Sequence, residues 1–74
     1  MAIATLSWLD RKGAGRSERG NAVKLARKLE TLRCVATLRN PQGEIIGGCQ
    51  RAFEGESDDR RVKWIWWYDE GELR

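Results

Sequence analysis

The chain has 74 residues, enough for one domain with a thin core and too few for a deep catalytic cleft. Apolar residues make up 41% and charged residues 34% of the chain, a balance that excludes a disordered or membrane-spanning protein. The net charge of +3 is uneven: residues 1–33 carry +5, residues 34–53 carry +1 and residues 54–74 carry −3. With no leader pattern at the amino terminus, we expect one cytoplasmic domain over residues 1–74, without membrane contact.

The first segments in chain order predict a strand and a loop. Residues 2–9 alternate loosely between small, β-branched and larger apolar side chains, which favours a strand over the alternative of a short helix. Residues 10–20 hold three glycines and four basic residues without a large apolar side chain, so they predict a mobile basic loop.

The next segment is the clearest helix of the sequence. Asn21 is a favourable N-cap, and apolar residues then follow at helical spacing: Ala22, Leu25, Ala26, Leu29 and Leu32. The opposite face carries Lys24, Arg27, Lys28 and Arg33. A solvated outer face is the simpler interpretation of these bases, and a basic partner-binding face is the alternative.

Residues 34–68 predict three antiparallel strands. The tetrapeptide Asn40-Pro41-Gln42-Gly43 is typical of a turn and joins strands at 34–39 and 44–53. A two-residue loop would place Arg39 opposite Glu44 and Cys34 opposite Cys49, whereas a glycine-bulge turn would shift the register by one residue. We expect two buried thiols rather than a disulfide, with a redox switch as the alternative.

The last third combines an acidic loop with an aromatic strand. An acidic hairpin loop at residues 54–60 contains Glu54, Glu56, Asp58 and Asp59. Residues 61–68 alternate, placing Val62, Trp64, Trp66 and Tyr68 on one face and Ile65 and Trp67 on the other. The expected fold is therefore α+β, with one helix packed on a three- to four-stranded antiparallel sheet in the order β-α-β-β-β.

One helix covers only one face of a small sheet, so an apolar patch is expected on the other. We assign to this partner-binding patch Trp67, Ile65, Ile46, Val35 and Lys63. An apolar centre with a charged rim is typical of a binding surface. The first strand, the basic loop or a second copy of the chain are the alternative covers for it.

The charged segments supply two further candidates. A basic surface for phosphate binding would comprise Arg11, Lys12, Arg16, Arg19, Lys24, Arg27 and Lys28. The acids that follow Phe53 would repel a polyanion, and no nucleic-acid-binding motif is present. The acidic loop could instead occupy a basic surface on another protein, or simply be solvated.

Catalysis and metal binding find no support in the sequence. The chain has no histidine, no nucleophile beside a base and no glycine-rich phosphate loop. Its two cysteines are too few for a zinc site. We expect a non-enzymatic chain without a cofactor.

A helix on a twisted antiparallel sheet, with split charge and exposed aromatic residues, resembles in size and architecture the small anti-CRISPR proteins of phages and mobile elements. The resemblance covers residues 21–68 and matches no motif residue by residue. It implies an inhibitor or adaptor that blocks a bacterial nucleic-acid-handling defence complex, such as a CRISPR surveillance complex, by steric occlusion. The alternatives are a small DNA- or RNA-binding domain and a homodimer that buries Trp67; monomer and homodimer both stay open.

Overall fold

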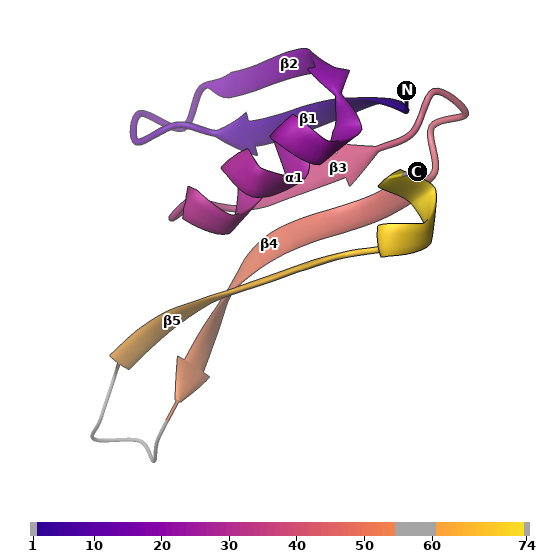
Figure 1. Ribbon diagram of the computed structural model, residues 1–74. Helices are drawn as coiled ribbons and strands as arrows, with labels where there is room; N and C mark the ends of the chain where they lie inside the picture. Colours follow the sequence, from indigo (N-terminus) through magenta and orange to yellow (C-terminus); the bar gives the residue numbers. More distant parts are fainter. Residues whose placement is uncertain (1, 55–60, 74) are drawn as a thin grey trace.

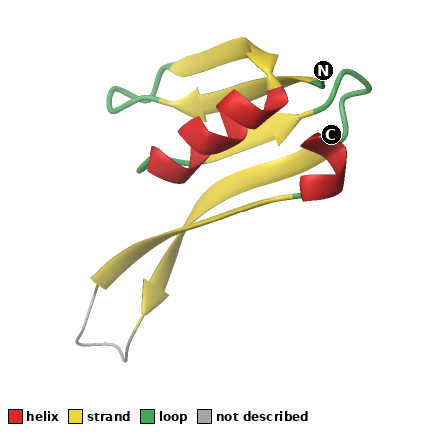
Figure 2. Ribbon diagram, in the orientation of Figure 1, coloured by secondary structure: helices red, strands yellow, loops and turns green. Residues whose placement is uncertain are grey.

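The computed structural model describes residues 2–54 and 61–73. The elements are β1 (Ile3–Leu9), β2 (Gly15–Asn21), α1 (Ala22–Thr31), β3 (Ala36–Arg39), β4 (Ile45–Glu54), β5 (Arg61–Tyr68) and a 3-10 helix, η1 (Glu70–Leu73). The strands form one antiparallel sheet in the order β2-β1-β3-β4-β5, and α1 lies across one face of it (Figures 1 and 2). The α+β class is confirmed, with five strands instead of three or four.

The structure corrects the prediction of a loop for the basic segment at residues 10–20. It forms a tight turn followed by β2, which pairs with β1 from Ile3 opposite Asn21 to Leu9 opposite Gly15. The backbone N–H of Asp10 donates to the carbonyl of Ala14 at 3.0 Å, closing the turn. The predicted loop was wrong because β2 carries no large apolar side chain, so backbone pairing alone defines it. The chain order is therefore β-β-α-β-β-β.

The predicted helix and its cap are confirmed. The Asn21 side-chain oxygen accepts hydrogen bonds from the backbone N–H groups of Val23 and Lys24, at 2.9 and 3.2 Å. Asn21 also ends β2, so the strand passes directly into the helix. No helix in the described ranges has the length and apolarity needed to cross a membrane.

The core lies between α1 and the sheet. Leu6, Leu29 and Leu38 are its largest fully buried side chains. The other buried apolar residues are Ala4, Ala22, Leu25, Ala26, Ala36, Ile46 and Cys49. Burial on this single side leaves the opposite face of the sheet uncovered by any described element, which makes that face available to a partner (Figure 2).

The turn between β3 and β4 is the second correction. The predicted two-residue loop is instead a three-residue loop, closed by a 3.0 Å bond from the Asn40 N–H to the Glu44 carbonyl. Gly43 takes a φ of 84°, which favours glycine. A further irregularity follows in the β3–β4 ladder, so Arg39 pairs with Ile45 and Ala36 with Cys49. The bulge buries Ile46, at 4% exposed, and leaves Ile45 at 52%.

Both cysteines are free. Cys49 is buried and its thiol lies 3.7 Å from the Leu32 carbonyl, whereas Cys34 is half-buried, so the expectation of two buried thiols holds for Cys49 only. The predicted pairing of Cys34 with Cys49 is wrong because the bulge shifts the ladder. Burial raises the pKa of both thiols.

The β4–β5 hairpin reaches beyond the helix (Figure 1). Strand β5 has the predicted bounds, and its helix-side residues Trp64 and Tyr68 are half-buried. Trp66 stays 43% exposed, and its ring stacks on that of Tyr68 at 5.5 Å between centroids. The Tyr68 hydroxyl donates to the Glu30 carboxylate at 2.8 Å, tying β5 to α1.

Candidate binding face of the sheet

The face of the sheet opposite α1, here called the open face, receives side chains from all five strands. One row crosses the whole sheet, each member opposite the next in the strand ladders: Ser17, Ser7, Thr37, Gly48 and Trp67. Four of these five residues are small, and the row ends in an indole. We call it the central row.

Because four of its residues are small, the surface of the sheet is depressed along the central row. One depression of the surface is lined by residues that include Ser7, Ser17 and Thr37, and another by residues that include Thr37, Gly48 and Trp67. A Cβ added at Gly48 would lie 3.3 Å from the Trp67 Nε1 atom. The glycine therefore lets the indole lie close against β4, while the Trp67 side chain stays 49% exposed.

Apolar residues flank the central row on one side. Leu9, Val35 and Ile65 lie there, between 42% and 51% exposed. Leu9 and Val35 are held side by side, since the Leu9 N–H donates to the Val35 carbonyl at 3.3 Å. Exposed aliphatic residues from β1, from β5 and from the position just before β3 surround an indole and form an apolar patch of the kind that marks protein-binding sites.

Arginines flank the central row on its other side. Arg19 and Arg39 both lie opposite Thr5 in the strand ladders, so the threonine lies between two arginines. Arg39 donates to the Gly43 carbonyl at 2.9 Å, which fixes its position over the turn. These residues line a separate depression with Asn40 and the following turn. The open face therefore has an apolar flank and a cationic flank.

The structure brings together most of the predicted patch. Val35, Ile65 and Trp67 lie on the open face, and Lys63 lies on the same side of β5, two residues before Ile65. The assignment of Ile46 to the patch is wrong, because the bulge turns it into the core.

Two apolar residues of this face were missed by sequence reasoning. Ile45, and not Ile46, is exposed on this face. The signal in the sequence was Gly43, because a glycine at that position permits the positive φ of a three-residue turn. Leu9 was assigned only to a strand, and its face became known with the β1–β3 pairing.

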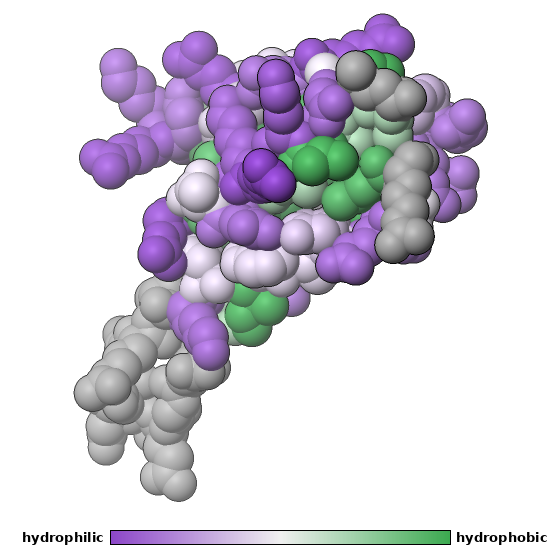
Figure 3. Space-filling model, viewed as in Figure 1, coloured by the Kyte–Doolittle hydropathy of each residue, from purple (hydrophilic) through white to green (hydrophobic). Residues whose placement is uncertain are grey.

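The predicted basic surface is divided between several parts of the fold. Arg19 lies on the open face, whereas Lys24 and Arg27 are exposed on α1, on the other side of the sheet. Figure 3, which views the α1 side, shows hydrophilic side chains gathered over the helix and the β1–β2 hairpin. Lys28 pairs with Glu18 at 2.7 Å and lies 4.5 Å from the centre of the Trp8 ring.

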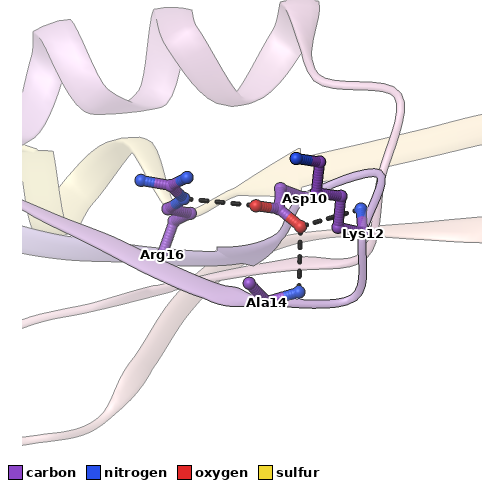
Figure 4. A network of polar contacts seen from close by, with 4 residues as sticks. All are labelled: Asp10, Lys12, Ala14 and Arg16. Carbon is purple, nitrogen blue, oxygen red and sulfur yellow. Dashed lines mark hydrogen bonds and ion pairs between the residues drawn. The ribbon is translucent and has the colours of Figure 1, made fainter.

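The β1–β2 turn uses part of the remaining basic set for structure. The Asp10 carboxylate accepts hydrogen bonds from the N–H groups of Lys12 and Ala14, each at 2.9 Å, and from Arg16 Nε at 3.2 Å (Figure 4). The bond from Ala14 contributes most to lowering the pKa of Asp10, with Arg16 and Lys12 adding to it. Arg11 and Lys12 are exposed in this turn.

The acidic loop at residues 54–60 lies outside the described residues, except that Glu54 is the last residue of β4. Its predicted role therefore stays a prediction. Within residues 2–54 and 61–73, no group of three His, Cys, Asp or Glu residues is placed to hold a metal ion. Comparison with protein-family models, with curated proteins and with solved structures gave no match for this chain.

Proposed function

We propose that the chain is a non-catalytic protein-binding domain that binds its partner through the open face. The observation that carries the proposal is the central row ending in the half-exposed Trp67, with Leu9, Val35 and Ile65 on one side and Arg19 and Arg39 on the other. Tryptophan and arginine are the residues most enriched among those that dominate binding energy at interfaces.

The two flanks specify the chemistry of the partner. A complementary surface would place apolar side chains over Val35 and Ile65 and carboxylates within reach of Arg19 and Arg39. Charge complementarity of this kind speeds association and selects the partner, while the apolar contacts supply affinity. Because most of the binding residues stand on paired strands of one sheet, little ordering of the backbone is needed on binding.

Inhibition by steric occlusion is the mode of action that we propose for this binding. A small rigid sheet that occupies a functional surface of a larger complex prevents that surface from meeting its own ligand. In keeping with the architectural resemblance, we propose a bacterial nucleic-acid-handling defence complex as the target, with the CRISPR surveillance complex as the first candidate.

The experiment is a capture assay with the tagged chain in bacterial lysate, with and without nuclease. We expect a defined protein complex to be retained after nuclease treatment by the wild-type chain and by Trp66→Ala, and lost with Trp67→Ala. The two variants are matched, since each removes one indole, 43% or 49% exposed, from opposite faces of β5. Equal retention by Trp67→Ala would contradict the proposal.

Single-stranded nucleic acid binding is the second candidate function. One observation favours it: the strands place three basic residues, Arg19, Arg39 and Lys63, on the same face as Trp67. Arginines would neutralise phosphates and Trp67 would stack a base. This function predicts affinity that falls steeply as salt rises, whereas an apolar protein interface predicts a shallow dependence.

A further inference from the structure

The two edge strands of the sheet differ in how they are protected against further pairing. Strand β2 carries glycine, serine and charged residues along its whole length, which discourages pairing with another strand. Strand β5 presents an uninterrupted run of five apolar or aromatic residues, from Trp64 to Tyr68. Ile65, Trp66 and Trp67 are each more than 40% exposed. The β5 edge is therefore the edge of the sheet that favours pairing with a further strand.

The direction of the free backbone groups on β5 follows from one bond. The Asp69 N–H donates to the Ile46 carbonyl at 2.8 Å, in line with the register that pairs Tyr68 with Gly47. In an antiparallel ladder, bonded and non-bonded pairs alternate. Backbone groups of Trp64, Trp66 and Tyr68 therefore point away from β4, toward the outer edge, where a further strand can bond to them.

We propose that β5 pairs with β5 of a second copy, antiparallel and centred on Trp66, so that two five-stranded sheets become one continuous sheet. This register joins outward backbone groups to outward backbone groups. It places Trp64 opposite Tyr68 and Ile65 opposite Trp67 of the other copy, and each such pair occurs twice by symmetry.

Charge complementarity selects a second copy as the occupant of this edge. In the same register Lys63 of one copy lies opposite Asp69 of the other, again twice. The strand is basic where it begins, with Arg61 and Lys63, and acidic just beyond its end, with Asp69 and Glu70. Antiparallel self-pairing matches these opposite ends, whereas parallel pairing would place like charges side by side.

This self-association does not rest on the proposed function, because it uses the edge of the sheet and not the open face. It would, however, bring the open faces of the two copies into one surface, with Ile65 and Trp67 of both copies adjacent at its centre. A partner with two equivalent sites would then bind with increased avidity.

The test is sedimentation equilibrium of the purified full chain, without partner, from about 1 μM to about 1 mM. We expect a monomer–dimer equilibrium. Each of the single variants K63E and D69K creates two like-charge pairs per dimer and should weaken the dimer by about tenfold. The double variant K63E/D69K restores opposite charges and should regain most of the wild-type affinity, which also controls for damage to the Asp69 turn.

A backbone probe makes the test independent of side chains. A synthetic chain N-methylated at Trp66 loses an outward N–H and should be monomeric, whereas N-methylation at Ser17, outward on β2, should leave the dimer intact. A wild-type chain that stays monomeric throughout would overturn the proposal. So would a dimer that is indifferent to both charge reversals and to Trp66 methylation, or one that only Trp67→Ala dissociates, which would place the interface on the open face.

Discussion

The indole of Trp67 lies directly against Gly48, and a Cβ at that glycine would stand 3.3 Å from the Trp67 Nε1 atom and 3.4 Å from the Ala36 carbonyl. The absence of a side chain at Gly48 thereby leaves room for the indole at the end of the central row. The position of the main candidate binding residue thus depends on a residue that contributes no side chain.

Replacing Gly47 or Gly48 by alanine should distinguish an effect on stability from an effect on partner binding. At Gly47 an added Cβ meets the Trp67 carbonyl and the Tyr68 Cβ at 3.0 Å, so the strand itself must shift; we expect a loss of about 1–3 kcal/mol in urea unfolding. At Gly48 the indole can move instead, so Gly48→Ala should cost less stability but weaken partner binding. Equal stability losses at the two positions would contradict this assignment.

The bond between Tyr68 and Glu30 predicts a pH effect at alkaline pH. The hydrogen bond to the Glu30 carboxylate is the main cause that raises the pKa of Tyr68 above 10.0. Because the folded pKa is the higher one, the bond stabilises the fold fully below the unfolded tyrosine pKa. This contribution is lost as pH rises through the folded value.

Tyr68 is the only tyrosine of the chain, so tyrosinate absorbance reports on it alone. We expect Glu30→Gln to lower its titration midpoint toward 10.0, with Glu18→Gln as the control that leaves it unchanged. A midpoint unaffected by Glu30→Gln would show that the bond does not form in solution.

The lowered pKa of Asp10 predicts a loss of stability at acidic pH. Its folded pKa lies below 3.8, so its ionised form stabilises the fold above the unfolded pKa, and this stabilisation is lost as pH falls through the folded value. Asp10→Asn keeps an acceptor for the Lys12 and Ala14 N–H groups but loses the Arg16 ion pair, whereas Asp10→Ala loses both. At neutral pH we expect stability to fall in the order wild type, Asn variant, Ala variant.

Denaturant unfolding at several pH values measures this order. The difference between the wild type and the Asn variant should begin to shrink as pH falls below 3.8, where the unfolded carboxylate takes up a proton, and should vanish below the lower folded pKa, where the folded carboxylate is protonated too. A difference that does not depend on pH would rule out the charge of Asp10 as its source.

The two thiols should react at different rates. Cys49 is 3% exposed, whereas Cys34 is only half-buried, and burial raises the pKa of each thiol. Since the thiolate is the reactive form, both should react more slowly than a free thiol, and Cys49 should react only on unfolding. Alkylation kinetics of Cys34→Ser and Cys49→Ser at matched pH would check this, and a fast-reacting Cys49 would contradict the buried position.

Sequence reasoning succeeded where one side-chain pattern dominates. The 3.6-residue period after Asn21 and the alternation from Arg61 to Tyr68 each have a single structural interpretation, and both elements formed as predicted. The apolar patch followed from them, because one helix covers one face. Which face the helix covers was left open by the sequence, so the strand pairing and the burial of the core were needed to place Val35, Ile65 and Trp67 on the open face.

The errors arose where backbone geometry, and not a side-chain pattern, determines the strand pairing and its register. Strand β2 has no apolar face, so its pairing with β1 leaves no trace in the sequence pattern. The Pro41-Gln42-Gly43 turn is compatible with loops of two or three residues, and the difference of one residue, with the bulge after it, exchanged Ile45 for Ile46 on the surface. Patterns of side chains do not encode register at that precision.

The most direct test of the central claim is the indole N–H region of an ¹⁵N-labelled chain, recorded with and without the captured partner complex. The four tryptophans give four indole signals, which substitution assigns one by one. We expect the Trp67 signal to shift or broaden most, while that of Trp8, packed beneath Lys28 on the helix side, keeps its position. A perturbed Trp8 signal beside an unchanged Trp67 signal would place the binding surface on the α1 side and contradict the account.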